Sequence, residues 1–268
     1  MPPVTPGTHP ETKAKAVWLM GIALLMALRR AMLRAVTRRG REAMRDATEP
    51  TSIATIYYRQ PRPEMLRFVP ATAKRVLELG CAEGAFAATV RQRACAEVWG
   101  IESNSQAAER ARAVIDRVLV GDADERITEL PDTYFDAIIC NDVLEHLVNP
   151  CTTLTHLRRK LMPDGVVVAS IPNIRFIPAL SKIVFHKDFP QDDVGIFDRT
   201  HLRFFTRKSI VRLFETAGFT MQRMKGINAY YGPFSLLLTL FSFGYFADGF
   251  YTQYACVASP ASPKAHSA

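Results

Sequence analysis

The stretch Arg75-Val-Leu-Glu-Leu-Gly-Cys-Ala-Glu-Gly-Ala-Phe86 decides the fold of this chain. Its first part is a short apolar run, typical of a strand that is buried on both faces. Gly80 follows this run, and Gly84 opens an Ala-rich helical stretch. Glycines let a backbone approach a ligand closely, and the start of a helix presents unpaired N–H groups. The order of strand, glycine turn and helix predicts a ligand-binding corner, with an ordinary strand-to-helix turn as the alternative.

Strands and helices alternate downstream of this corner. The predicted strands cover residues 75–80, 97–102, 117–120, 135–140, 165–171, 219–225 and 251–258. The predicted helices cover residues 84–93, 106–115, 151–161 and 207–217. Such alternation predicts an α/β fold with a parallel sheet that helices cover on both faces. A ligand is then expected beyond the carboxyl ends of the strands.

Polar residues stand at four of these predicted carboxyl ends. They are Glu78 in the first strand, Glu102 in the second, Asp122 after the third and Asn141 after the fourth. Glu102 lies some two dozen residues beyond the first strand, where an acidic side chain can accept hydrogen bonds from both hydroxyls of a ribose. The four strand ends together favour a nucleotide-like cofactor over chance polarity.

The positive charge of the chain is concentrated at its N-terminal end. The whole chain of 268 residues carries a formal charge of +8, of which residues 1–48 supply +6 and residues 49–268 only +2. A broad phosphate-binding face is therefore not expected in the body of the protein. The chain also lacks the Asn/Asp-Pro-Pro-Tyr/Phe motif of base-flipping methylases, so no nucleic-acid partner is predicted.

The N-terminal region is predicted to be a separate extension. Residues 1–48 indicate a disordered start followed by a basic amphipathic helix, and residues 49–73 lead into the core. An apolar run over 17–28 is too short to span a bilayer, whereas a basic face opposite an apolar one over 16–41 suits an anionic membrane surface. The alternative is a helix packed on its own domain or on a partner. Residues 259–268 are predicted to be a disordered tail.

The cysteines favour a reducing compartment. Five of them are scattered along the chain, and none shows the spacing of a zinc site. We expect a cytoplasmic protein, with peripheral contact at the inner face of the membrane through the N-terminal helix.

The motifs in this order resemble those of the class I S-adenosylmethionine-dependent methyltransferases, of the type 11/23-like group that acts on small molecules, saccharides or lipid intermediates. The matching pieces are residues 76–84, Gly100-Ile-Glu-Ser103, Gly121-Asp-Ala123, residues 135–147 and residues 161–173. The resemblance covers residues 74–258. It implies a Rossmann-like seven-stranded sheet, mostly parallel with an antiparallel last strand, and S-adenosyl-L-methionine as the cofactor.

The resemblance also implies roles for single residues. The turn from Gly80 to Gly84 would face the methionine part of the cofactor, Glu102 the ribose, and Asp122 with Ala123 the adenine. Ala82 stands where many members carry a third glycine, and a slightly tighter turn is expected there. A dinucleotide site is disfavoured because the Gly-x-Gly-x-x-Gly pattern is missing. The predicted cofactor-binding residues are Glu78, Gly80, Cys81, Ala82, Gly84, Glu102, Ser103, Asp122, Ala123, Asn141, Asp142 and Val143.

Candidate catalytic residues follow the fourth predicted strand and precede the helix at 207. His146 and His201 are candidate general bases, because histidine commonly serves this role near neutral pH. Asp198 lies in the same polar loop as His201, and an Asp198–Arg203 pair that only pins the loop is the alternative. Asp142, Glu145 and His146 resemble the metal cluster of ubiquinone-pathway O-methyltransferases. On a helix Glu145 and His146 would point apart, so no metal is assigned.

The leading hypothesis is methyl transfer to a hydroxyl of a small molecule, a saccharide or a lipid-linked intermediate. The alternatives are N- or carboxyl-methylation, and a non-catalytic cofactor-binding module at a membrane surface. An insert over about 174–206 is predicted on the substrate side. The apolar segment 231–250 is expected to shape a substrate pocket or touch a membrane, or to complete the core as a helix.

Overall fold

The computed structural model describes residues 61–94 and 96–261. The predicted N-terminal helix, residues 49–60 of the entry segment and residues 262–268 of the predicted tail lie outside these ranges, so those predictions stay predictions. The predicted start of the tail is wrong, because Ser259 and Pro260 still pair within the last strand. Within the described part, no helix is long and apolar enough to cross a membrane.

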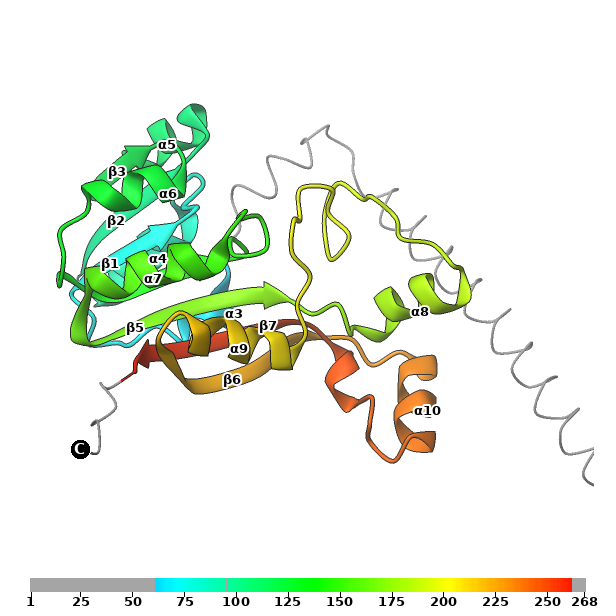
Figure 1. Cartoon of the computed structure of the whole chain (residues 1–268). Helices are drawn as coiled ribbons and strands as arrows, with labels where there is room; N and C mark the ends of the chain where they lie inside the picture. Colours follow the sequence, from blue (N-terminus) through cyan, green and yellow to red (C-terminus); the bar gives the residue numbers. More distant parts are fainter. Residues whose placement is uncertain (1–60, 95, 262–268) are drawn as a thin grey trace, which may run out of the picture. The chain divides into compact units, whose positions relative to one another are not determined.

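A seven-stranded sheet forms the centre of the described part (Figure 1). Its strands lie in the order β3-β2-β1-β4-β5-β7-β6. β7 runs antiparallel to both of its neighbours, and all other pairs are parallel, which confirms the predicted sheet. The strands are β1 (Arg75–Leu79), β2 (Glu97–Glu102), β3 (Arg117–Val120), β4 (Phe135–Asn141), β5 (Leu161–Pro172), β6 (Phe219–Ala229) and β7 (Tyr251–Pro260).

Helices cover both faces because successive strand side chains point to opposite sides. Val76 belongs to one buried cluster and Leu77 to the other. The first cluster contains side chains of α3 (Pro63–Leu66), α4 (Ala85–Ala94) and α5 (Ser105–Ala111). The second contains those of α7 (Pro150–Lys160), α9 (Arg207–Thr216) and the short 3-10 helix η1 (Ile127–Glu129). The carboxyl ends of the parallel strands stay clear of both layers.

Several boundaries differ from the prediction. α5 ends at Ala111. Beyond it the N–H groups of Ala113 and Val114 donate to carbonyl oxygens three residues earlier instead of four, so the α-helical pattern stops. β5 begins at Leu161, where it pairs with Phe135 beside a register shift. Residues 144–146 form a turn before α7 begins at Pro150.

Two excursions lie beyond the carboxyl end of β5 (Figure 1). The first follows β5 and holds α8 (Ile177–Phe185) and a long loop up to α9. The second lies between β6 and β7 and holds α10 (Pro233–Phe241) and the 3-10 helix η2 (Ala247–Phe250). Their bases are joined, since Asn173 Nδ2 donates to the carbonyl oxygens of Asp248 at 2.9 Å and Tyr251 at 3.0 Å. The segment 231–250 is therefore an outlying helix and turn rather than a completion of the core.

Candidate active site

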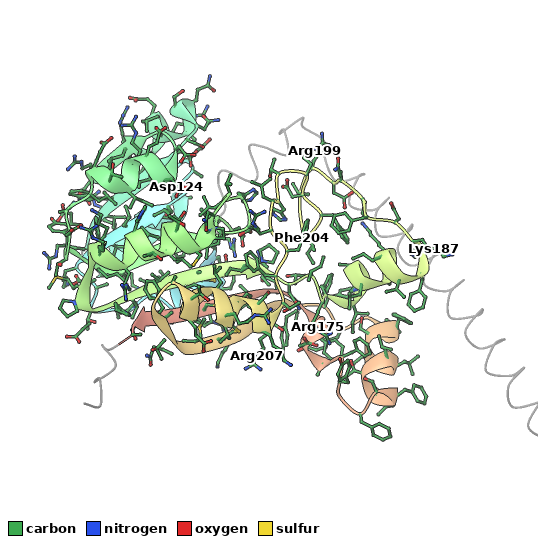
Figure 2. The ribbon with its side chains drawn as sticks, viewed as in Figure 1. Asp124, Arg175, Lys187, Arg199, Phe204 and Arg207 are labelled. Carbon is green, nitrogen blue, oxygen red and sulfur yellow. The ribbon has the colours of Figure 1, made fainter. Side chains whose placement is uncertain are left out.

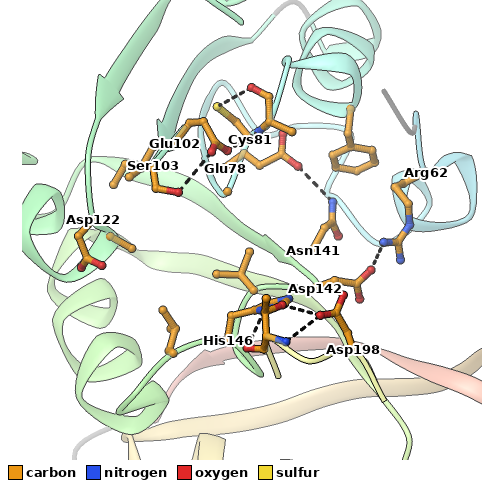
Figure 3. Close-up of a pocket in the computed structure, with 18 of the residues that line it drawn as sticks. Arg62, Glu78, Cys81, Glu102, Ser103, Asp122, Asn141, Asp142, His146 and Asp198 are labelled. Atoms are coloured by element: carbon orange, nitrogen blue, oxygen red, sulfur yellow. Dashed lines mark hydrogen bonds and ion pairs between the residues drawn. The ribbon is translucent and has the colours of Figure 1, made fainter. Parts of the chain in front are cut away.

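A cavity of about 750 Å³ opens at the carboxyl ends of the parallel strands (Figure 3). It is lined by all of the predicted cofactor-binding residues except Gly84. The lining ones are Glu78, Gly80, Cys81, Ala82, Glu102, Ser103, Asp122, Ala123, Asn141, Asp142 and Val143. The sheet topology thus brings together residues that are more than sixty positions apart in the chain.

The turn after β1 lets the backbone line the cavity directly. Gly80 has φ +63°, and a Cβ there would lie 2.8 Å from Cγ2 of Val143. Gly84 has φ +81°, and a Cβ there would lie 2.8 Å from Cγ2 of Val114. Gly84 therefore serves the packing of α4 and does not line the cavity.

Glu102 ties the end of β2 to this turn. Its Oε2 accepts from the backbone N–H of Ala82 at 2.8 Å, and its Oε1 accepts from the N–H of Asn104 at 2.8 Å. Oε1 also accepts a longer hydrogen bond from the Ser103 hydroxyl at 3.5 Å (Figure 3), so Oε2 is the oxygen that retains a lone pair for a further donor. Ala82 has φ +50°, a left-handed conformation that costs a residue with a side chain roughly 1–2 kcal/mol. This conformation explains why a glycine suits the position.

Asp122 and Ala123 close the end of the cavity near β3. Asp122 caps the short helix α6 (Ala123–Arg126), where its Oδ1 accepts from the N–H of Asp124 at 2.8 Å. Asp122 also lines the cavity, so its second carboxylate oxygen remains available to a ligand.

Glu78 is a buried carboxyl that lines the same cavity. Its Oε1 accepts from Nδ2 of Asn141 at 3.2 Å (Figure 3), while its Oε2 has no hydrogen-bond partner among the described residues. Oδ1 of Asn141 is buried and unpartnered in the same way. Burial raises the pKa of Glu78 to about 8. Two buried acceptors without donors suit a ligand that carries N–H groups, such as an ammonium.

The Asp142 carboxylate is held by the protein itself. Arg62 pairs with it, Oγ of Ser170 donates to it at 2.8 Å, and Nε2 of Gln253 donates to it at 2.7 Å. Its backbone stands in the left-handed region, with φ +52°. Sequence reasoning missed Arg62, which precedes α3 in the segment leading into the core. No local pattern marks it, because its partner is eighty residues away.

His146 lines the cavity opposite Glu102. Its Nδ1 lies 3.2 Å from the carbonyl oxygen of Thr200 and 3.0 Å from Oγ1 of Thr200. That hydroxyl donates to Oδ1 of Asp198 at 2.6 Å, so it accepts from the imidazole. Both partners therefore place the ring proton on Nδ1 and leave the lone pair on Nε2. Burial and the neighbouring His201 lower the pKa of His146, which keeps the ring neutral near pH 7.

The predicted Asp198–Arg203 pair is wrong. Asp198 accepts from the backbone N–H and the hydroxyl of Thr200, whereas Arg203 donates to the carbonyl oxygens of Leu202 and Val148. A carboxylate two residues before a threonine is well placed for this local turn. Asp198 consequently orients His146 through Thr200.

His201 lines a second cavity, of about 700 Å³, and not the first. The two cavities adjoin, since Asp142, Val194 and Asp198 line both. The rings of His146 and His201 meet edge to face, with centroids 4.7 Å apart. Apolar side chains dominate the rest of the second cavity, among them Phe176, Pro178, Ala179, Ile196 and Phe197.

Glu145 lies beside the two histidines. Its carboxyl is fully buried, neither oxygen has a hydrogen-bond partner among the described residues, and burial raises its pKa well above the usual range. Its Oε1 is 3.9 Å from Nε2 of His201. The expectation that Glu145 and His146 point apart was wrong, because they lie in a turn rather than a helix. Ligand atoms of Glu145, His146 and His201 lie within 4.8 Å of one another, a donor set able to hold a divalent metal.

The methyltransferase domain family matches residues 53–223 of this sequence. The chain belongs to this family. S-adenosylmethionine is accordingly the methyl donor of this class I enzyme, and the unpartnered acceptors of Glu78 and Asn141 fit its ammonium-bearing methionine part.

Proteins that are similar to this chain in sequence are also named as methyltransferases. A ubiquinone biosynthesis O-methyltransferase of Aeromonas salmonicida is 27% identical over 60% of this chain and 68% of its own length. A probable S-adenosylmethionine-dependent methyltransferase of Mycolicibacterium smegmatis is 29% identical over 57% of this chain and 54% of its own length. A trans-aconitate 2-methyltransferase of Methylobacterium radiotolerans is 34% identical over 42% of this chain and 44% of its own length. The chain thus matches about half the length of most of these relatives.

A solved structure shows the same fold. A methyltransferase from Archaeoglobus fulgidus superposes with a TM-score of 0.55 at 19% identity, over 76% of this chain and 93% of its own. At this identity the likeness concerns the fold alone.

Proposed function

We propose that this methyltransferase acts on a hydroxyl group of a small molecule, a saccharide or a lipid-linked intermediate. The observation that carries the proposal is the position of His146, a neutral imidazole with its lone pair on Nε2, in the cofactor cavity where the second cavity adjoins it. A hydroxyl must lose its proton as it is methylated, so it needs a base at this place. A carboxylate acceptor would need none.

The chain's own residues would hold the cofactor at four places. Glu102 would accept from the ribose hydroxyls, Glu78 from the ammonium of the methionine part, and Asp122 would meet the adenine edge. The backbone at Gly80 allows close approach. The sulfonium supplies an electrophilic methyl group when it is bound.

The second cavity is the proposed acceptor site. Its apolar lining suits the body of an acceptor, while the polar residues shared with the first cavity, Asp142 and Asp198, mark where a hydroxyl would meet the cofactor site. His201 is the second candidate base, and its side chain is 6% exposed. Its Nδ1 donates to the carbonyl oxygen of Ile196 at 3.1 Å, which leaves the lone pair on Nε2. Enclosure of this kind excludes water that would compete for the methyl group.

The names of two relatives point to different acceptors. One is an O-methyltransferase, which supports transfer to oxygen, and another is named for trans-aconitate, an acid. Carboxyl methylation is therefore the second candidate. Methylation of a hydroxyl needs a base and methylation of a carboxylate does not, so the effect of removing the base separates the two reactions.

The test uses S-adenosylmethionine with an isotopically labelled methyl group and a methyl-acceptor extract. We expect labelled product that resists mild alkali, as an ether does, and loss of labelling in His146→Asn. His156→Asn, an exposed histidine on α7, is the matched control. Label released by alkali as methanol would identify an ester and overturn the hydroxyl proposal, whereas undiminished labelling by His146→Asn would exclude His146 as the base and leave His201.

A further inference from the structure

We propose that the outer surface of α8 and α10 binds a lipid bilayer. We call this surface the apolar tip. It consists of Val184, Phe185 and Phe189 of the first excursion and Leu236, Leu240, Phe241, Phe243 and Tyr245 of the second. The proposal concerns where the protein sits and does not depend on which acceptor is methylated.

The side chains of the apolar tip face solvent to an unusual degree. Leu240 is 71% exposed, Phe241 76% and Phe243 100%. Within α10 only Ser235 is fully buried, and Leu236, Leu240 and Phe241 of this apolar helix point into solvent. A contiguous group of large exposed apolar residues marks an interaction site in a folded protein.

The composition of the tip suits the interface between lipid and water. Residues 226–247 contain no Lys, Arg, Asp, Glu or His. Aromatic rings, especially tyrosine, favour the headgroup level of a membrane, where Tyr245 would lie behind Phe241 and Phe243. α10 has 9 residues, which is enough for shallow insertion and too few to span.

The two excursions present this surface as one preformed body. The rings of Phe185 and Phe234 meet edge to face with centroids 6.1 Å apart. Arg175 holds Asp248 through two contacts, at 2.7 and 3.1 Å, and its guanidinium also lies 5.4 Å from the ring centre of Tyr245. The tip therefore does not need to order itself when it binds, which lowers the entropic cost of docking.

The net charge of the whole chain, +8, favours a bilayer with anionic lipids over a purely apolar partner. Lys187 lies just beyond the end of α8, at the margin of the described part (Figure 2) and next to Asp188, whereas Lys182 within α8 pairs with Asp192. Residues 1–48 supply +6 of the net charge. Each basic residue near an anionic surface contributes about 1 kcal/mol, screened by salt.

α8 also connects the tip to the second cavity. Pro178, Ala179 and Lys182 line that cavity, while Val184 and Phe185 of the same helix belong to the tip. A protein docked through the tip would hold the second cavity close to the lipid surface.

The test is co-sedimentation of the full chain with vesicles of phosphatidylcholine containing phosphatidylglycerol. The triple variant Leu240→Ser, Phe241→Ser, Phe243→Ser removes exposed side chains only, so it should unfold as the parent does. We expect it to bind these vesicles at least tenfold more weakly. Phe243→Trp should bind as the parent does, and Val148→Ser, which removes a 71% exposed apolar residue away from the tip, should have no effect.

Three results would overturn the proposal. The first is vesicle binding by the triple variant equal to that of the parent, whether or not high salt abolishes it, because residues 1–48 would then account for the binding. The second is a parent chain that does not sediment with vesicles. The third is a parent dimer that the triple variant converts to a monomer without any change in vesicle binding, which would make the tip an interface between copies.

Discussion

The backbone N–H of Ala82 donates to Oε2 of Glu102 over 2.8 Å, so the carboxylate proposed to hold the ribose also fixes the turn after β1. The cofactor cavity thus depends on Glu102 twice, once for a ligand contact and once for the shape of its own wall. Loss of Glu102 should therefore weaken both cofactor binding and the folded state.

Glu102→Ala should weaken binding of S-adenosylmethionine at least tenfold, which corresponds to about 1.4 kcal/mol. It should also lower the free energy of unfolding by about 1–3 kcal/mol, because the N–H groups of Ala82 and Asn104 lose their acceptor. Calorimetric titration and urea unfolding measure the two effects. Glu109→Ala, on the exposed side of α5, is the control. Equal affinity in the Glu102 variant would contradict the ribose assignment.

The buried carboxyl of Glu78 should make the stability of the cofactor-free protein depend on pH. Its pKa of about 8 lies above the ordinary value of 4.5 for a glutamate. Between these values the folded state binds more protons than the unfolded state, so the free energy of unfolding should fall as pH rises from about 4.5 to 8. The slope is at most about 1.4 kcal/mol per pH unit. Glu78→Gln should remove this contribution, so its stability relative to the parent should rise with pH in urea unfolding.

A cationic group bound at Glu78 would favour its ionised form. Binding of S-adenosylmethionine at pH 7 should therefore release a proton from the parent protein and none from Glu78→Gln. Calorimetry in two buffers of different ionisation enthalpy measures this difference. Identical proton release in both proteins would place the ammonium elsewhere.

His146→Ala should lower turnover by about 10²–10⁴, the usual contribution of a general base, while cofactor affinity changes little. Because burial and His201 lower the pKa of His146, its base form persists as pH falls. The turnover of the parent should stay level from pH 8 to below pH 6.5 and decline only under that range. His201→Ala should also reduce turnover more than cofactor affinity. A His146 variant that keeps full turnover would leave His201 as the base.

The Arg62–Asp142 pair should couple the start of the described chain to the site. Its side chains are 12% and 15% exposed, so removal of the guanidinium leaves a largely buried carboxylate. Arg62→Ala should cost about 1–3 kcal/mol of unfolding free energy. The double variant Arg62→Ala, Asp142→Asn should be less destabilised than the sum of the single changes, which urea unfolding of the four proteins would show.

Local sequence pattern sufficed for most of the sheet and for the cofactor side of the site. Short apolar strands such as 97–102 carry their own signal, and a residue at the carboxyl end of a parallel strand, such as Glu102, is placed by topology alone. The catalytic side was harder, because its geometry depends on where a long loop returns. Thr200 reaches His146 across 54 positions, and Arg62 reaches Asp142 across 80. From the sequence alone a helix is expected after Asn141, on which Glu145 and His146 would point to different faces. The sequence therefore does not predict that Glu145, His146 and His201 lie close together.

The position of β7 bears on how the protein is made. β7 follows β6 in the chain, yet it lies between β5 and β6 in the sheet, and its Gln253 donates to Asp142. A ribosome that has released residues only as far as β6 has therefore delivered an edge strand without its one sheet neighbour, and the Asp142 carboxylate without one of its hydrogen-bond donors. Cofactor retention by nascent chains should appear only after β7 has left the exit tunnel. Translation order thus sets a late moment at which this enzyme becomes competent.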